Sequence, residues 1–242
     1  LILQRFKALL LERPLLDPLE IERLVSIQSP DGRWPDVVYD DNATTWWDVF
    51  NHLQRTEHLA LAFAHPKSPW FSRENLQVAI GRALDDWTTN RYQCTNWWYN
   101  RIGVPHCIRN ILLLVQGAIT KESEEFGWSV VSQNQGFEKR GEGANLVWLA
   151  ESALCLAAHR YDESLLSEAA TAIAEEVLVG RPEGIQSDYS YFQHGARLQS
   201  LSYGADFALD VCRIAWALRD TVWALPAEKL DIVASFVVNP DA

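Results

Sequence analysis

Apolar side chains recur every three or four residues along most of the chain, which is the spacing of one face of an α-helix. Phe207, Val211, Ile214 and Leu218 follow this period in one segment. With prolines, glycines and capping residues as boundaries, the pattern predicts about nine helices and no strand. We expect helices over residues 1–12, 18–28, 46–64, 75–87, 104–116, 145–160, 163–179, 207–218 and 226–237.

The predicted helices come in pairs of similar length, without sequence identity between the pairs. This order predicts an all-α fold of antiparallel helical hairpins, and a closed or partly closed α/α toroid fits it. Function is expected in the loops, because binding and catalytic residues concentrate there on a rigid scaffold. The relevant loops lie near residues 90–100, 120–145 and 184–204, and residues 120–143 are predicted to form one long surface loop.

The stretch 184–207 has the composition of neither a core helix nor a plain linker. It combines aromatic residues with a histidine, an arginine and two aspartates, and it has almost no apolar periodicity. His194 and Tyr203 stand out, because imidazole and phenol are easily tuned to move a proton near neutral pH. An ordinary surface loop with ordinary hydrogen bonds is the alternative interpretation of this stretch.

Composition narrows the classes of partner. The formal net charge of −11 argues against nucleic acid or an anionic membrane surface, and a polyanionic ligand would need local positive charge. No run approaches the roughly 18 apolar residues of a membrane span. The 242 residues fit one large domain or two small ones, and the 11 tryptophans among them can fill a core or form flat platforms for ligands.

No metal or cofactor site is predicted. The four cysteines show neither a Cys-x-x-Cys pair nor zinc spacing, and Cys155 and Cys212 lie in apolar helical patterns that predict buried thiols. The histidines at 52, 58 and 65 lack a His-Glu-x-x-His motif. The chain opens inside a predicted helix and contains no methionine, so we expect its native N-terminus to lie before Leu1.

Three motifs in the polar loops resemble signatures of polysaccharide lyase family 8, which includes hyaluronate, chondroitin AC and xanthan lyases. They are NWWYNRIGVP at 96–105, GAN at 143–145 and QHGARLQSLSYG at 193–204. DGRWPDVVY at 31–39 resembles a further stretch of the family. The motifs occur in family order, and their spacing is close to the family's.

The resemblance implies an incomplete (α/α) toroid that cleaves a uronic-acid polysaccharide such as hyaluronan, chondroitin or xanthan by β-elimination. It implies no cofactor and no nucleic-acid or membrane partner, and a secreted, periplasmic or cell-surface location. By motif, Asn145, His194 and Tyr203 correspond to the catalytic residues. Trp97 and Trp98 correspond to the aromatic patch that grips the sugar chain.

Asn96 accompanies the two tryptophans in the family pattern, whereas two nearby positions depart from it. Arg101 stands where the family usually has an acidic or amide residue, and His106 stands where it often has arginine. The family's catalytic arginines and a supporting glutamate lie further along the chain than Ala242, and β-sandwich domains follow them. We therefore expect residues 1–242 to be an α/α-toroid catalytic domain that is incomplete as a catalytic unit.

β-Elimination removes the C5 proton of a uronate and expels the oxygen on C4. That proton is a poor acid beside a charged carboxylate, so donors such as the Asn145 amide and the His194 imidazole must draw charge from the carboxylate. Tyr203 is expected to act as base for the proton and as acid for the leaving oxygen. A phenol has a pKa near ~10, so positive charge must stabilise the phenolate. Arg197 is the local candidate, and Arg197 and Arg101 are both predicted to bind the acidic chain.

Two other functions remain as alternatives. An α/α-toroid glycoside hydrolase would need two carboxylates facing each other across a cleft. Asp188 could pair with Asp36 or Asp206, but no spacing singles these residues out. A non-catalytic domain that binds acidic polysaccharide would keep only the tryptophan platform.

Single residues also have structural interpretations. Asn145 could be a helix N-cap, because asparagine is among the preferred residues there. One of Trp97 and Trp98 could be a core side chain, since adjacent residues point in different directions. Trp46 and Trp47 are both predicted to lie in the core.

Overall fold

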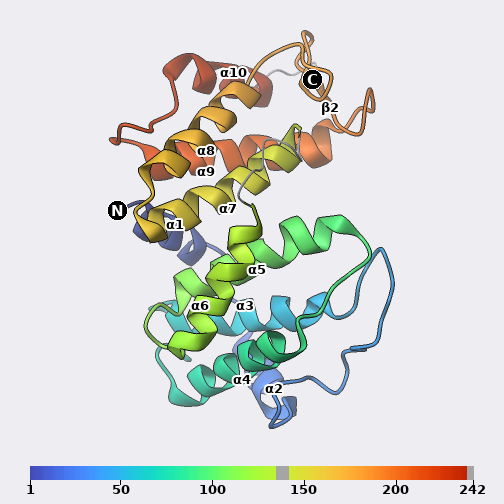
Figure 1. The fold of residues 1–242 in the computed structure, drawn as a ribbon, viewed down its shortest axis with the longest axis vertical. Helices are drawn as coiled ribbons and strands as arrows, with labels where there is room; N and C mark the ends of the chain where they lie inside the picture. The colour runs from blue at the N-terminus through green and yellow to red at the C-terminus, as the bar shows by residue number, and fades with distance from the viewer. Residues whose placement is uncertain (135–141, 239–242) are drawn as a thin grey trace. The chain divides into compact units, whose positions relative to one another are not determined.

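The protein, described here by a computed structural model, is built from helices. The structure describes residues 1–134 and 142–238, and this part contains ten α-helices and one short pair of strands (Figure 1). The predicted all-α class is therefore confirmed. Contacts between Cα atoms divide the chain into two compact units, Phe6–Gln133 and Asn134–Ala242, with Leu1–Arg5 belonging to the second.

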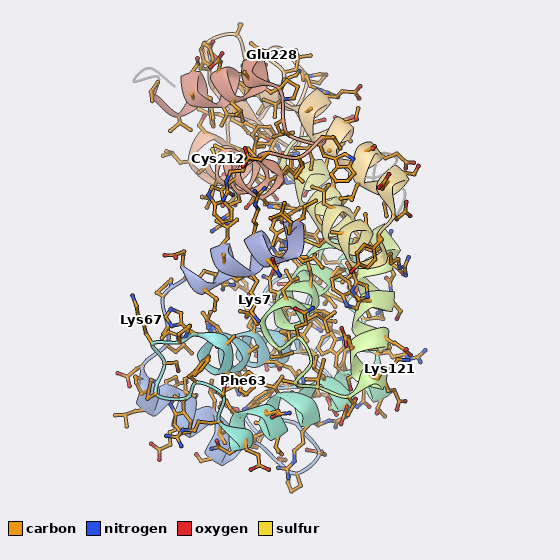
Figure 2. All side chains as sticks on the ribbon, turned by 90° about the vertical axis from the view of Figure 1, so that its left-hand side faces the viewer. Lys7, Phe63, Lys67, Lys121, Cys212 and Glu228 are labelled. Atoms are coloured by element: carbon orange, nitrogen blue, oxygen red, sulfur yellow. The ribbon has the colours of Figure 1, made fainter. Side chains whose placement is uncertain are left out.

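The unit Phe6–Gln133 is an array of packed helices. They are α2 (Pro18–Ile27), α3 (Phe50–Ala64), α4 (Glu74–Asn90), α5 (Val104–Leu114) and α6 (Lys121–Val131). α3 packs against α4 and α5, and α6 packs against the same two helices. The second half of α1 (Ile2–Leu11) belongs to this unit and carries Lys7, which is labelled in Figure 2. The Lys7 ammonium donates a 3.0 Å hydrogen bond to the Leu114 carbonyl.

The unit Asn134–Ala242 is organised around one buried helix. Its helices are α7 (Ala144–Arg160), α8 (Glu163–Glu176), α9 (Ala205–Leu218) and α10 (Ala227–Val238). α7 packs against α8 and α9, and α10 packs against α9. Nearly every α7 residue from Ala144 to Ala157 is buried, as expected of a helix that is apolar on all sides. Between α8 and α9, strands β1 (Gly184–Ile185) and β2 (Tyr191–Phe192) pair antiparallel.

Two helix starts follow the predicted capping chemistry. The Asp17 carboxylate accepts a hydrogen bond from the Leu19 amide, and Pro18 takes the first helical position of α2. Asp162 caps α8 in the same way, through the Leu165 amide. Ser72 offers capping chemistry just before α4, but Arg73 occupies the N-cap position and makes no side-chain capping bond.

The long surface loop predicted over residues 120–143 is wrong in its first half. Residues 121–131 form α6, which Thr120 caps by accepting a hydrogen bond from the Ser123 amide. Charged residues fill its first turn, whereas Trp128, Val130 and Val131 are buried near its end. The high charge concealed an amphipathic helix. The rest of that loop lies largely outside the described residues.

The predicted core pair Trp46 and Trp47 is only half correct. Trp47 is 3% exposed, but Trp46 is 93% exposed and has a φ of 56°. α3 starts at Phe50 rather than near residue 46, because Asp41 holds the preceding turn through hydrogen bonds from the Ala43 and Asp48 amides. A similar correction applies to Cys212, which is exposed on α9, whereas Cys155 is buried as predicted.

The motif at 31–39 has a structural role. Trp34 is fully buried and donates through its indole nitrogen to the Leu24 carbonyl at 2.9 Å. The Arg33 guanidinium forms an ion pair with Asp86 of α4 at 2.8 Å. These contacts join the segment after α2 to α4, so this motif supports the fold of its unit.

Candidate active site

His194 and Tyr203 form a hydrogen-bonded pair. The His194 Nε2 atom lies 3.0 Å from the Tyr203 hydroxyl, and the two rings meet edge to face with centroids 5.0 Å apart. His194 is exposed and Tyr203 is partly exposed, so a ligand can reach both rings. The two side chains picked out by the sequence are thus brought into direct contact.

The backbone on both sides of this pair is irregular. His194 follows β2 with a φ of 57°, in the left-handed region that few non-glycine residues occupy. Tyr203 lies in a π-helical turn, Ser200–Gly204, that runs directly into α9. π-Helical turns are rare and frequently occur at functional sites. Such strain is kept only where surrounding contacts hold it, and Gly195 donates its amide to the Glu183 carboxylate at 2.7 Å.

Gln193 connects the His194 loop to the start of α7. Its side chain is fully buried, and its Oε1 atom accepts from the Ala144 amide at 3.2 Å. Its Nε2 atom donates to the Glu142 carbonyl at 3.3 Å and to the Glu183 carboxylate. Ala144 and Gln193 directly precede Asn145 and His194. This one side chain therefore sets the positions of two predicted catalytic residues relative to each other.

Gly143 allows this close approach. Its φ is 59°, and a Cβ atom there would lie 2.5 Å from the Gln193 Oε1 atom and 2.8 Å from the Tyr191 hydroxyl. A substitution would therefore push Gln193 out of place. The Gly143 amide donates to the buried Glu176 carboxylate at 2.6 Å, and burial raises the pKa of Glu176. The GAN motif thus needs glycine for steric reasons.

Asn145 is not a helix N-cap. Gly143 holds that position, and Asn145 lies in the first turn of α7 with 7% of its surface exposed. Its buried Oδ1 atom accepts no hydrogen bond from any residue in the described part of the chain. Buried amides are normally satisfied, and leaving one unpaired costs about 1–3 kcal/mol. A buried side-chain amide with an unpartnered oxygen is typical of a residue that binds a ligand.

Tyr203 has a pKa above its ordinary value. Burial is the main cause, and the carboxylates of Asp206 and Glu183 add to it. Trp148 of α7 lies against the ring with centroids 5.7 Å apart, and its indole nitrogen donates to Asp210 at 2.8 Å. Burial, and then the charge of Glu151, raises the pKa of Asp210 in turn. Tyr203 is therefore a neutral phenol in the free protein, held between His194 and Trp148.

The predicted aromatic patch lies in the unit Phe6–Gln133. A second π-helical turn, Tyr99–Gly103, follows the two tryptophans and runs into α5. Trp97 is 47% exposed. Trp98 is half-buried, and a Cβ on Gly103 would lie 2.8 Å from its ring. Trp97 therefore provides an open platform, whereas Trp98 packs inward.

Asn96 holds the loop that presents Trp97. Its Oδ1 atom accepts from the Trp98 amide at 3.0 Å, and its Nδ2 atom donates to the Thr44 carbonyl at 2.8 Å. Both ends of the amide are therefore engaged in loop structure. Contact between Asn96 and substrate stays a prediction.

The two predicted arginines have different surroundings. The Arg101 guanidinium donates to the carbonyl of Gln133, which lies in the short turn after α6. Arg197 is exposed beside the His194 loop, and its backbone carbonyl accepts from the Gln193 amide at 3.1 Å. No arginine contributes to the pKa shift of Tyr203 among the described residues. The cationic role of Arg197 stays a prediction.

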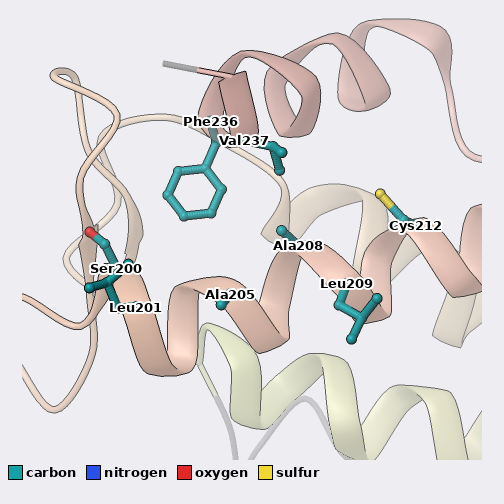
Figure 3. A pocket seen from close by; sticks show the side chains of 8 residues that line it. All are labelled: Ser200, Leu201, Ala205, Ala208, Leu209, Cys212, Phe236 and Val237. Atoms are coloured by element: carbon teal, nitrogen blue, oxygen red, sulfur yellow. The ribbon is translucent and has the colours of Figure 1, made fainter. Parts of the chain in front are cut away.

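A separate apolar pocket lies where the turn Ser200–Gly204 runs into α9. Figure 3 shows it between the start of α9 and the end of α10, lined by Ser200, Leu201, Ala205, Ala208, Leu209, Cys212, Phe236 and Val237. None of the predicted site residues lines it. Its lining offers little for recognising an acidic sugar, so it is not the candidate active site.

Two further findings concern metal-ligand clusters and membrane-spanning helices among the described residues. No three His, Cys, Asp or Glu side chains gather as a metal site in residues 1–134 and 142–238. Over the same ranges, every helix is too short or too polar to cross a membrane.

The chain is similar in sequence and in fold to known polysaccharide lyases. Chondroitinase-AC of Pedobacter heparinus is 34% identical over 230 residues, covering 93% of this chain and 33% of that protein. Hyaluronate lyase HylB of Enterococcus faecalis is 26% identical over 220 residues, covering 80% of this chain and 22% of that protein. This chain thus spans about a third or less of the length of these relatives.

Solved structures agree. A chondroitinase AC lyase, studied as enzyme–oligosaccharide complexes, matches with a TM-score of 0.88 at 32% identity over 99% of this chain and 36% of that one. Paenibacillus xanthan lyase has the same fold, with a TM-score of 0.81 at 17% identity over 98% of this chain and 25% of that one.

The fold is thus that of the helical domain of a polysaccharide lyase. The profile "Polysaccharide lyase family 8, N terminal alpha-helical domain" matches residues 19–240. The chain belongs to polysaccharide lyase family 8, as the motifs predicted.

Several residues of the site escaped the sequence interpretation. Gln193 lies inside a recognised motif, yet its bridging role depends on a contact to Ala144, 49 residues away. Glu183 lies in a predicted loop, and Trp148 lies within a predicted helix. The one sequence signal for Glu183 is its charge in a short segment between two glycines, Gly180 and Gly184.

Proposed function

We propose that the protein cleaves a uronic-acid-containing polysaccharide by β-elimination at the C4–O bond. The observation that carries the proposal is the 3.0 Å contact between His194 and Tyr203, joined through Gln193 to the helix start that bears Asn145. Family membership supports the same reaction class. Because this chain spans only part of its relatives, the activity of the whole protein is part of the proposal.

The raised pKa of Tyr203 suits an acid, so base catalysis needs a way to form the phenolate. His194 provides it. With Nε2 unprotonated, the imidazole takes the Tyr203 proton across the 3.0 Å contact, which leaves an imidazolium beside a phenolate. The positive imidazolium stabilises the phenolate and also draws charge from the substrate carboxylate. This step supplies a positive charge beside Tyr203, where no described arginine or lysine contributes to the pKa shift.

Proton transfer then proceeds through one oxygen. The Tyr203 phenolate takes the C5 proton, and the C5 electron pair forms the C4–C5 double bond as the C4–O bond breaks. The Tyr203 hydroxyl gives the same proton to the departing oxygen. The phenolate is regenerated, and neither water nor a redox partner is consumed. A group in this double role must be within reach of the substrate, and the partial exposure of Tyr203 supports this.

Asn145 is proposed to bind the substrate carboxylate. Its Oδ1 atom has no partner among the described residues, so nothing there holds the amide against a half-turn that would put the Nδ2 donor in the same place. Asn145 also lies at the N-terminus of α7, where the helix dipole favours negative charge. The carboxylate gains further negative charge when C5 loses its proton. A preorganised donor at that point therefore stabilises the transition state more than the ground state.

The substrate is proposed to be an acidic polysaccharide such as hyaluronan, chondroitin or xanthan. Trp97 offers an open aromatic face to a sugar ring, and Arg101 and Arg197 are proposed to meet its acidic groups. No cofactor takes part in this scheme. Such substrates are polymers found outside cells, so we propose a secreted, periplasmic or cell-surface protein, in which residues 1–242 form the α/α-toroid catalytic domain.

Product analysis tests the proposal. The protein is incubated with hyaluronan, chondroitin, xanthan and alginate, and absorbance in the near ultraviolet is followed together with reducing ends. A lyase yields both signals, because the new C4–C5 double bond is conjugated to the carboxylate. Reducing ends without absorbance would identify a hydrolase. Binding without either signal would identify a sugar-binding domain, and both of these outcomes would overturn the proposal.

A further inference from the structure

The side chain of Trp46 is exposed to solvent. It is 93% exposed, although tryptophan is among the most apolar side chains and its neighbour Trp47 is 3% exposed. Its φ of 56° lies in the left-handed region, where a bulky residue is an outlier. Both features are unfavourable for the folded protein, and neither is offset by packing. Such outliers tend to persist at ligand-binding sites.

The loop that carries Trp46 is fixed from within. The Asp41 carboxylate accepts hydrogen bonds from the Ala43 amide at 2.9 Å and the Asp48 amide at 2.7 Å. The Trp47 indole donates to the Asp41 carbonyl at 3.1 Å. Trp46 is therefore presented by an anchored turn rather than by a loose end.

The same loop is bonded to the segment that presents Trp97. The Asn96 amide donates to the Thr44 carbonyl at 2.8 Å, and the Trp47 amide donates to the Tyr99 hydroxyl at 3.3 Å. Thr44 and Trp47 enclose Trp46 in the sequence, and Asn96 and Tyr99 enclose Trp97. The two exposed tryptophans therefore lie on two neighbouring loops. Hydrogen bonds join these loops at residues just before and just after each tryptophan.

We propose that Trp46 is a second sugar-binding platform, which stacks on a pyranose ring of the same polysaccharide that Trp97 contacts. This inference rests on the proposed function for the identity of the polymer. Residues 40–48 contain three aspartates and no lysine or arginine. The ring bound here is therefore a neutral sugar of the chain, such as an N-acetylhexosamine, rather than a uronate.

Stacking on Trp46 should strengthen binding of long chains only. An oligosaccharide too short to cover both Trp97 and Trp46 cannot use the second platform. Removal of one aromatic stacking contact weakens binding by about tenfold, by analogy with bases on aromatic platforms. The KM for long chains should rise by that factor, while the KM for the shortest substrate and the kcat for both stay the same.

Trp46→Gly is the most informative variant. It removes the indole and relieves the left-handed backbone, so the melting temperature should not fall while KM for long chains rises. Trp46→Phe keeps an aromatic face and should retain most of the binding. Trp216→Ala removes another partly exposed indole, 38% exposed on α9, and should leave KM unchanged.

The test measures KM and kcat on short and long hyaluronan and chondroitin oligosaccharides, with calorimetric affinities for the same ligands. An unchanged affinity of Trp46→Gly for long chains would overturn the inference. A lower melting temperature with equal losses on short and long chains would also overturn it, by making Trp46 a structural residue. Affinities are measured in the Tyr203→Phe background, which should bind without turnover. A protein that binds but makes no unsaturated product would then refute the lyase proposal and leave this test intact.

Discussion

Replacement of Gln193 by alanine should separate catalysis from stability. The Gln193 side chain is fully buried and forms hydrogen bonds with the Ala144 amide, the Glu142 carbonyl and the Glu183 carboxylate, and a longer one of 3.5 Å with the Tyr191 hydroxyl. A bond to a charged group is worth about 1.5–3 kcal/mol, and a neutral bond about 1 kcal/mol. We therefore expect the free energy of unfolding to fall by about 4 kcal/mol. Urea unfolding of the variant measures this loss.

The effect on turnover should exceed what this instability explains. Without Gln193, the His194 loop and the start of α7 lose their common anchor, so His194 and Asn145 no longer hold one geometry. A displacement of about 1 Å at a catalytic group can cost roughly 10²-fold in rate. We expect kcat to fall between about 10-fold and 100-fold. Initial rates are read from near-ultraviolet absorbance well below the melting temperature, so that the variant is fully folded.

Gln186→Ala is the matched control. Gln186 lies in the same hairpin and donates to the Arg181 and Gly184 carbonyls, both at 2.9 Å, but it does not touch α7. It should lose stability and keep kcat near the wild-type value. If Gln193→Ala and Gln186→Ala show the same kcat, Gln193 does not position the catalytic residues.

Three further predictions follow from the same contacts. Asn145→Ala should lower kcat more than it raises KM, by about 3–4 kcal/mol in activation free energy as for a lost oxyanion donor; a variant that only melts earlier would make Asn145 structural. Trp97→Ala should weaken oligosaccharide binding by about 1–3 kcal/mol, whereas Trp98→Ala should mainly lower the melting temperature. If calorimetry finds that both variants lose stability equally and keep their affinity, both tryptophans are core residues. Because burial raises the pKa of Asp210 in the folded state, its contribution to stability is complete below the ordinary carboxyl pKa of about 4 and is lost as pH rises through the raised value. Asp210→Asn should therefore gain stability relative to wild type between acid and neutral pH, and urea unfolding that shows a constant difference would contradict this.

The sequence predicted the helices well where local chemistry decides them. Asp17 and Asp162 cap helices by their own side chains, and α9 follows a plain apolar period. α6 escaped because its first turn is charged, so its buried face becomes visible only late in the segment. Trp46 and Trp47 are the same residue type in adjacent positions. Only the hydrogen bonds of Asp41 and Asn96 decide which indole is buried.

The motifs identified the family and the individual catalytic candidates, but not how they are held. The GAN motif pointed to Asn145, and the structure adds that Gly143 leaves room for Gln193. That contact joins residues far apart in the chain, so no local pattern reports it. The π-helical turns before α5 and α9 are also invisible in the sequence, since their apolar spacing differs little from that of an α-helix.

The turnover of Tyr203→Phe tests the central claim most directly. The variant keeps the ring that packs against Trp148 and loses only the oxygen that lies 3.0 Å from His194. Folding and oligosaccharide affinity should therefore stay close to wild type. A general acid–base group is worth about 10²–10⁴-fold in rate, and one that serves both proton transfers should reach the upper end. We predict a loss of about 10⁴-fold in the formation of unsaturated product, whereas a variant that keeps more than about a tenth of the wild-type rate would remove Tyr203 from the mechanism.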